Sequence, residues 1–278
     1  MSNGICNLPL IPLRSEPSER SEMISQVLFG ELFEVIETVD SWSQIRLLSD
    51  NYTGWCTRKM LQLLPDDVFE KYRHEKPSLT QAVLSPCFKL GDDQPQLFLP
   101  AGSRLYFLEQ DSGRFPVVQS STADVSTLKK STWSIHPALI AQNDLQQDDE
   151  ILSTASLFTN APYLWGGKSI LGIDCSGFVQ VVFSIHGYSL PRDARDQEMC
   201  GEAVSVISQS EPGDLAFFAN AEGKVVHVGL LMKGQSILHA SGSVHIDRVD
   251  STGIYSDSLG KYTHQLHSIR RIVPAINA

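Results

Sequence analysis

At residues 161–178 the chain contains the segment Ala-Pro-Tyr-Leu-Trp-Gly-Gly-Lys-Ser-Ile-Leu-Gly-Ile-Asp-Cys-Ser-Gly-Phe, which places a cysteine where a helix is predicted to begin. Asp174 can cap this helix, because its side chain can accept hydrogen bonds from the first backbone N–H groups. Apolar residues then recur at helical spacing, as Phe178, Val181, Val182 and Ile185. The pattern stops at Gly187, a typical C-terminal glycine. We therefore predict a helix of about three turns that starts almost at Cys175.

A helix start would give the Cys175 thiol unusual chemistry. The first turn offers free backbone N–H groups and the positive end of the helix dipole, which both favour thiolate over thiol. A thiolate attacks carbonyl carbon atoms, and the same N–H groups can stabilise the oxyanion that forms. Cysteine is also among the most frequently buried residues, so an inert core residue is the alternative interpretation. Which interpretation holds depends on the residues that lie near the thiol.

Two histidines further along the chain are candidate partners. Residues 225–240 form two β-rich runs around Lys233-Gly234, a hairpin signal. With a three-residue loop at 232–234 and its glycine in the left-handed conformation, His227 is predicted to lie opposite His239. Their Cβ atoms would then be about 5 Å apart on one face of the sheet.

Each histidine by itself is explained as an ordinary polar residue of a sheet. Together with Cys175, one imidazole can take the thiol proton while the other orients it, which is the logic of a catalytic triad. The alternative is a metal site, because Cys175, His227 and His239 are also good zinc ligands. Zinc would deprotonate the thiol as well, so the sequence leaves both interpretations open.

Six short motifs follow one another between residues 162 and 240. They are Pro162-Tyr-Leu-Trp-Gly-Gly167, Asp174-Cys-Ser-Gly-Phe-Val179, Leu190-Pro-Arg-Asp193, Pro212-Gly-Asp-Leu-Ala-Phe-Phe218, His227-Val-Gly229 and Leu238-His-Ala240. In type and order they resemble the NlpC/P60 cysteine peptidases of bacterial cell-wall metabolism. The resemblance implies an α+β, papain-like catalytic domain over residues 143–278. It also implies Cys175 as nucleophile, His227 as general base and His239 as the orienting residue, with no metal or organic cofactor.

The same resemblance implies further substrate-binding residues around the nucleophile. It places Tyr163 close enough to contact the thiolate or to assist the oxyanion hole, and it places Asp174 and Ser176 beside a γ-D-glutamyl unit. Asp174 alone is equally explained as a helix cap. Arg192 and Asp193 either form an ordinary surface ion pair or line the specificity pocket, and their match to the family motif favours the pocket.

The first half of the chain has the pattern of small all-β modules. Runs such as 27–36, 42–47 and 52–56 are separated by Asp, Ser and Asn turns, and residues 30–45 are echoed more weakly at 102–115. Both copies resemble bacterial SH3-like (SH3b) barrels. We predict a first SH3b-like domain at 1–70 and a second, with its connector, at 71–142. The connector would be the charged, proline-bounded segment 65–77.

The order of domains resembles a subgroup of the family in which the first SH3b domain binds the free amine of a peptide that begins with L-Ala. An acidic residue and a tyrosine do this in the subgroup. Glu22 and Tyr52 are the candidates here, although Glu16 and Glu19 lie in the same segment and each acid is also explained as part of a solvated loop.

Composition narrows the possible partners and the compartment. The chain has 278 residues and a net charge of −10, which argues against nucleic acid and anionic membranes as partners. No signal sequence or membrane-spanning stretch is apparent, and five cysteines without CxxC spacing suit reduced thiols. We therefore expect a cytoplasmic monomer, or a periplasmic or extracellular protein if a signal sequence has been removed.

The expected reaction is hydrolysis of the γ-D-glutamyl–diamino acid bond of murein (peptidoglycan) stem peptides that carry a free N-terminal L-Ala, in the recycling of wall fragments. The diamino acid would be diaminopimelate or lysine. A non-catalytic wall-binding protein and an amidase or acyltransferase of the same fold are the alternatives.

Overall fold

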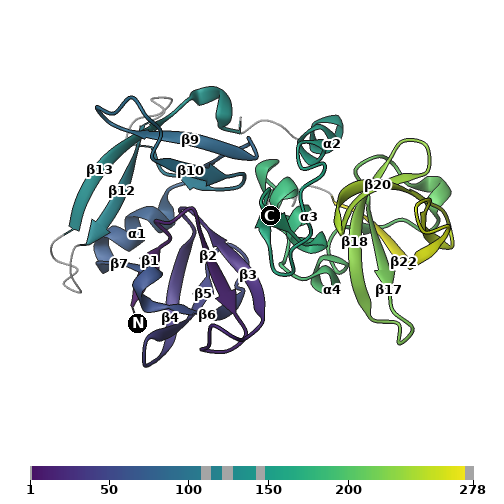
Figure 1. Cartoon of the computed structure of the whole chain (residues 1–278), viewed down its shortest axis with the longest axis horizontal. Coiled ribbons are helices and arrows are strands. Elements are labelled where there is room, and N and C mark those ends of the chain that lie inside the picture. Colours follow the sequence, from purple (N-terminus) through teal and green to yellow (C-terminus); the bar gives the residue numbers. More distant parts are fainter. Residues whose placement is uncertain (1, 108–113, 121–127, 142–147, 273–278) are drawn as a thin grey trace. The chain divides into compact units, whose positions relative to one another are not determined.

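The computed structural model describes residues 2–107, 114–120, 128–141 and 148–272. The chain divides into two compact units, Met1–Asn143 and Asp144–Ala278, and each is described by itself (Figure 1). The first is mostly β-sheet and the second combines helices with a β-barrel, so the predicted α+β class is confirmed. No helix among the described residues is both long and apolar enough to cross a membrane.

The first unit begins with a seven-stranded antiparallel sheet of order β3-β2-β6-β5-β4-β1-β7. Its strands are β1 Asn3–Ile5, β2 Leu10–Arg14, β3 Met23–Leu28, β4 Leu32–Val39, β5 Trp42–Leu47, β6 Thr53–Thr57 and β7 Gln62–Leu64. The predicted run 27–36 is divided between β3 and β4 by a turn at Gly30, where φ is +78°. A Cβ atom at Gly30 would lie 2.0 Å from the carbonyl oxygen of Arg104, so only glycine fits this turn.

A second group of strands follows within the same unit. The sheet β10-β9-β13-β12 and the strand pair β11-β8 are made of β8 Ser78–Leu79, β9 Leu84–Lys89, β10 Leu97–Pro100, β11 Arg104–Leu105, β12 Arg114–Ser120 and β13 Leu128–Ile135. Their core includes Cys87, Leu99 and Phe115. Phe29 from the first group packs edge-on against Phe115, with ring centroids 5.9 Å apart. The two groups of strands therefore share apolar contacts.

The predicted connector at 65–77 is partly helical. Helix α1 spans Asp66–His74 and buries Phe69 and Tyr72. Tyr72 packs edge-on against Tyr106 of the second group of strands, with ring centroids 4.9 Å apart. The charged residues of this segment dominated its sequence pattern, but its aromatic residues make it part of the core of the unit.

The second unit is built on a seven-stranded antiparallel sheet of order β16-β22-β17-β18-β19-β20-β21, and an additional β21–β22 pairing closes it into a barrel. These strands are β16 Glu202–Ala203, β17 Leu215–Ala219, β18 Val225–Met232, β19 Ser236–Ser241, β20 Ser243–Val249, β21 Gly253–Ser256 and β22 Lys261–Arg271. The remaining described helices and strands are α2 Asp148–Ser156, α3 Cys175–Ile185, α4 Ala194–Gln197, the 3-10 helix Ile207–Gln209, β14 Lys168–Ser169 and β15 Gly172–Ile173.

Helix α3 confirms the helix predicted from the sequence. It begins at Cys175 and ends at Ile185, and Gly187 follows with φ +82°, as expected for a C-terminal glycine. Its apolar residues are buried, and Phe178 packs edge-on against Phe158 with ring centroids 5.8 Å apart. The helix contacts β18 and β19 of the barrel (Figure 1), and the N–H of Val228 on β18 forms a hydrogen bond with Cys175, the first residue of the helix.

Candidate active site

Asp174 caps helix α3, as its position in the sequence predicted. Its backbone is extended, and its Oδ1 accepts a hydrogen bond of 2.7 Å from the N–H of Gly177. Its Oδ2 accepts a hydrogen bond of 2.8 Å from the N–H of Gly166, in the glycine pair before the helix. The carboxylate therefore ties the loop at Gly166 to the first turn of the helix that carries Cys175.

A buried arginine completes this network. Arg192 binds both carboxylate oxygens of Asp174, with Nη2–Oδ2 and Nη1–Oδ1 distances of 2.6 and 3.1 Å. It also donates to the Ser176 hydroxyl at 2.8 Å. Arg192 is only 2% exposed, so it is not part of a surface ion pair. Asp193 precedes α4 and lies 3.5 Å from Arg195. The network fixes the segment around Cys175, and contacts of these residues with substrate stay a proposal.

The predicted hairpin forms, but its predicted register is wrong. Met232 pairs with Ser236 and Gly229 pairs with His239, so the loop is 233–235 and His239 lies two residues away from the position opposite His227. The shift is an even number of residues, so both histidines stay on the same face of the sheet. Gly229 makes room for this arrangement, because a Cβ atom there would lie 2.8 Å from the Cβ of His239.

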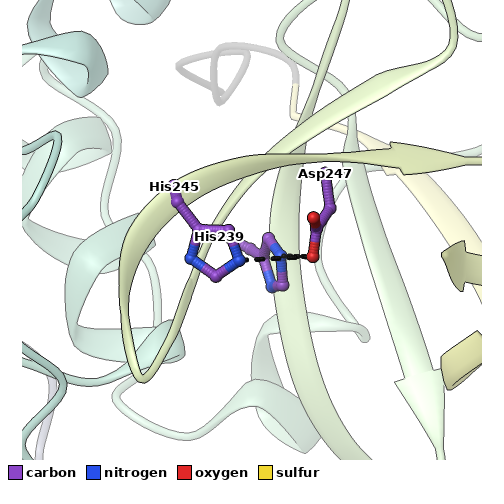
Figure 2. A group of neighbouring side chains, drawn as sticks. All are labelled: His239, His245 and Asp247. Atoms are coloured by element: carbon purple, nitrogen blue, oxygen red, sulfur yellow. Dashed lines mark hydrogen bonds and ion pairs between the residues drawn. The ribbon is translucent and has the colours of Figure 1, made fainter. Parts of the chain in front are cut away.

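The imidazoles of His227 and His239 contact each other, although the two residues are diagonal and not directly opposite on the paired strands. His227 Nε2 lies 2.8 Å from His239 Nδ1. On the other side of His239, its Nε2 faces Oδ2 of Asp247 at 3.4 Å, as Figure 2 shows. A carboxylate can only accept, so a hydrogen bond to Asp247 puts the proton of His239 on Nε2 and leaves Nδ1 to accept from His227. His227 then keeps an unprotonated Nδ1, which is the form that a general base requires.

Several residues around the pair were not singled out from the sequence. The ring of His264, on β22, stacks on His227 with centroids 4.2 Å apart, and Phe218 packs on the same imidazole at 5.8 Å. Asp247 and His245 lie on β20, where His245 pairs directly with His239. The alternation His245-Ile-Asp247 after a glycine turn was the sequence signal that could have indicated them.

Burial dominates the pKa of the Cys175 thiol. Cys175 is 6% exposed, and its burial together with the charge of Asp174 raises the pKa of the thiol to about 12. Hydrogen bonds from the N–H groups of Val228 and Ser176 and the charge of Arg192 oppose this effect. The N–H of Ser176 at the helix start favours the thiolate, as expected, but burial outweighs it, so the thiol needs a base to take its proton.

The histidines are suited to receive that proton. Burial and three neighbouring histidines lower the pKa of His227 well below its ordinary value. Burial and His245 lower the pKa of His239 to about 4, although Asp247 opposes the shift. Both rings are therefore neutral at neutral pH. A neutral imidazole and a neutral thiol are the forms required if proton transfer is to accompany nucleophilic attack.

Tyr163 lies near the thiol, where the family resemblance placed it. Burial, followed by the charges of Cys175 and Asp174, raises the pKa of its phenol to about 12. Tyr163 is half-buried, and its N–H donates to the carbonyl of Gly242 at 2.9 Å. A phenol that keeps its proton is a hydrogen-bond donor, which is compatible with the proposed contact to a thiolate or an oxyanion.

The alternative of a zinc site made by Cys175, His227 and His239 is not supported. Ligand atoms around tetrahedral zinc lie about 3.3 Å apart or more, as bond lengths of about 2.0–2.3 Å require. The facing nitrogens of His227 and His239 are 2.8 Å apart, which is a hydrogen-bond distance.

The two candidates for amine binding belong to the first unit. Glu22 is exposed and directly precedes β3, and Tyr52 is half-buried and directly precedes β6. Arg14 of β2 pairs with Met23 on one side and Trp55 on the other, so both candidates lie near the same end of the sheet. Glu19 forms an ion pair with Arg14 at 3.1 Å. A role of Glu22 and Tyr52 in the site of the second unit stays a proposal.

Comparison with known proteins identifies the family to which the chain belongs. The profile of the NlpC/P60 family matches residues 160–263, which contain Cys175, His227 and His239. A gamma-D-glutamyl-L-lysine dipeptidyl-peptidase of Bacillus subtilis is 31% identical over 230 residues, covering 78% of this chain and 71% of that protein. The chain belongs to the NlpC/P60 family.

Other relatives of this NlpC/P60 protein extend over most of its length. Dipeptidyl-peptidase 6 of Lysinibacillus sphaericus is 29% identical over 264 residues, covering 89% of this chain and 92% of the relative. The crystal structure of an NlpC/P60 family protein from Bacillus cereus has a TM-score of 0.81 at 20% identity, covering 98% of this chain and all of that one, which shows a common fold. A bacterial dipeptidyl-peptidase SH3 domain matches residues 13–61. The second SH3b-like domain stays a prediction.

Proposed function

We propose that this NlpC/P60 protein hydrolyses the amide bond between γ-D-glutamate and an L-diamino acid in short murein peptides. The observation that carries the proposal is that Cys175 begins α3 and receives a hydrogen bond from the N–H of Val228, the residue after His227, whose imidazole pairs with that of His239 at 2.8 Å. The neutral thiol and the neutral His227 supply a nucleophile and a base. A wall-binding protein without activity would have no use for this arrangement.

In the proposed reaction, His227 takes the thiol proton at Nδ1 as the sulfur of Cys175 adds to the γ-carbonyl carbon. The resulting imidazolium is stabilised by donation from its Nε2 to Nδ1 of His239. His227 then protonates the leaving amine of the diamino acid, and an acyl-enzyme remains on the sulfur. A water molecule, deprotonated by the same His227, hydrolyses the thioester and restores the thiol.

The names of the relatives support the choice of bond and of product. The Bacillus subtilis relative is a gamma-D-glutamyl-L-lysine dipeptidyl-peptidase, and a dipeptidyl-peptidase releases two residues from a free amino end. Here the released dipeptide would be L-Ala-γ-D-Glu. We propose that Glu22 pairs with the ammonium of L-Ala and that Tyr52 contacts it with its ring, since a desolvated ammonium needs a carboxylate partner.

The test of this substrate uses matched peptides. We expect acetylation of the N-terminal L-Ala of L-Ala-γ-D-Glu-L-Lys to lower kcat/KM at least about tenfold, because the ion pair with Glu22 is lost. In Glu22→Gln, acetylation of the peptide should lower kcat/KM by a smaller factor than in the wild-type protein. Glu19→Gln is the control, because Glu19 pairs with Arg14. Rates are measured by quantifying the released diamino acid.

Equal rates on the free and acetylated peptides would contradict the amine-binding role. Cleavage of N-acetylmuramoyl-L-alanine peptides at the muramoyl–alanine amide would indicate an amidase. A panel that contains lysine and diaminopimelate in the third position also decides which diamino acid is preferred.

The lowered pKa of His227 predicts an acid-tolerant enzyme. A base must be unprotonated to act, so activity is lost as pH falls through its pKa, and here that pKa lies well below the ordinary 6.5. We expect the acid limb of kcat/KM to have its midpoint below pH 6.5. The measurement is a pH profile of kcat/KM at constant ionic strength. His267→Gln, which changes a partly exposed histidine paired with Glu198, should leave the profile unchanged. A midpoint at or above 6.5 would contradict a buried neutral base.

We also propose that the reaction takes place in the cytoplasm, in the recycling of wall fragments. All five cysteines of the chain lie among the described residues, and each is a free thiol. Free thiols fit a reducing compartment. Cell fractionation with an antibody to the protein tests the location, and accumulation of tripeptides in a deletion strain tests the recycling role.

A further inference from the structure

We propose that His239, His245 and Asp247 form a binding site for a divalent transition metal such as Zn²⁺, and that metal bound there switches off the catalytic histidine pair. Figure 2 shows the three side chains converging from β19 and β20. One ligand atom from each residue lies within 4.8 Å of the others. Two imidazoles and one carboxylate with further coordination positions left open are a common ligand set for zinc.

The sheet itself builds this cluster. His239 pairs directly with His245 in the β19–β20 ladder, and Asp247 follows two residues after His245, so the three side chains share one face. Burial changes across the cluster, because the side chain of His239 is 1% exposed, that of Asp247 13% and that of His245 35%. A metal ion could therefore reach the site from the His245 side.

Two of the three separations between the candidate ligand atoms also suit a metal ion. Oδ2 of Asp247 lies 3.4 Å from Nε2 of His239 and 3.2 Å from Nε2 of His245. These contacts are longer than the usual 2.9–3.0 Å of an N–H···O hydrogen bond. They are close to the separation of about 3.3–3.5 Å between ligand atoms that share a tetrahedral zinc ion.

The hydrogen bonds of His245 give an independent reason. Its Nδ1 lies 2.8 Å from the carbonyl oxygen of Ser243. A carbonyl oxygen can only accept, so Nδ1 carries the proton, and Nε2 of the neutral ring presents a lone pair. That lone pair faces Oδ2 of Asp247, which also offers only lone pairs. Two lone pairs that face each other repel, and a cation bound between them would be attracted to both. A second proton on His245 would also remove this repulsion, and this competing explanation predicts that no metal binds.

A metal ion bound at this site would change which ring nitrogens of His239 and His227 carry the protons. Metal on Nε2 of His239 moves the ring proton to Nδ1, which then donates to Nε2 of His227 across the 2.8 Å contact. His227 would have to keep its own proton on Nδ1. It could then neither take the thiol proton of Cys175 nor donate from Nε2 as an imidazolium. The inhibitory part of the proposal rests on the proposed cysteine-peptidase function, whereas metal binding does not.

The first experiment measures binding without the thiol. Isothermal titration with ZnCl₂ is done on Cys175→Ala, so that sulfur cannot contribute a ligand. We expect about one equivalent of Zn²⁺ to bind, and MgCl₂ to give no comparable signal, because Mg²⁺ prefers oxygen ligands. Adding His245→Gln to this variant should weaken Zn²⁺ binding at least about tenfold, whereas adding His267→Gln should not change it. No binding to Cys175→Ala, or equal binding after His245→Gln, would overturn the site.

The second experiment measures inhibition. The rate of each protein without metal is the reference for its own rate with metal. Saturating Zn²⁺ should lower wild-type kcat/KM at least about tenfold, and a chelator should restore it. Inhibition should be lost in His245→Gln. Equal inhibition of both proteins would show that Zn²⁺ acts at the thiol, and binding without inhibition would overturn the regulatory role. If the wild-type protein cleaves none of the peptides, the proposed function fails, but the binding experiment still decides the metal site.

Discussion

Replacing Cys175 with alanine is expected to abolish turnover of L-Ala-γ-D-Glu-diamino acid peptides while the protein stays folded. The sulfur is the only atom lost, and Asp174 still caps the helix through the N–H of Gly177. We expect a loss of at least about a thousandfold in kcat/KM, the scale seen when the nucleophile of a catalytic triad is removed. Cys175→Ser should be similarly inactive, because a hydroxyl is far harder to deprotonate than a thiol.

The histidines should separate into two roles in the same assay. His227→Ala removes the base and should be nearly as damaging as Cys175→Ala, whereas His239→Ala should keep measurable turnover, because orientation is only part of the rate. Cys200→Ala is the control, since Cys200 is a partly exposed thiol of the same unit. Circular dichroism and thermal unfolding verify the fold of each variant. Near wild-type activity in Cys175→Ala would end the cysteine-peptidase hypothesis.

Arg192→Met is expected to destabilise the second unit by about 3–5 kcal/mol, the usual cost of leaving one charge of a buried ion pair without its partner. Arg192 is 2% exposed and binds both oxygens of Asp174. Methionine fills much of the volume but leaves the carboxylate with no cationic partner, only its backbone donors and the Ser176 hydroxyl at 3.4 Å. The free energy of unfolding is measured with urea.

Two further variants make this measurement specific. Arg195→Met changes a 72% exposed arginine nearby, paired with Asp193 at 3.5 Å, and should alter stability by less than about 1 kcal/mol. Asp174→Asn combined with Arg192→Met should recover part of the loss, because the neutral amide no longer needs a counter-ion. A change of less than about 1 kcal/mol in Arg192→Met itself would mean that water replaces the guanidinium.

The local parts of the site could be predicted from the sequence. The boundaries of α3 follow from Asp174, the spacing of apolar residues and Gly187, which are all contained in one short segment. The shared face of His227 and His239 follows from the two-residue period of a strand. The register of the β18–β19 hairpin could not be predicted in this way, because two three-residue loops around Gly234 are compatible with the same turn signal. The structure uses 233–235.

Other features depend on packing that no local pattern contains. The raised pKa of Cys175 results from burial, which outweighs the helix start. Arg192 pairs with Asp174, and these two residues lie on either side of α3. The sequence alone gave equal reason to expect that Arg192 pairs with its neighbour Asp193. The stacking of His264 on His227 requires β22 to lie beside β17, a contact between distant segments.

The position of β22 has a consequence for biosynthesis. This strand pairs with β17 and β21 and carries His264 against His227, yet among the strands described for the unit it is the last to leave the ribosome. Until then, β17 and β21 each expose an unpaired edge, which is where nascent chains associate wrongly. The barrel must therefore close after translation of β22, through contacts that are distant in sequence and slow to form. A half-made chain has no complete histidine site, so proteolytic competence arises only once this strand has docked.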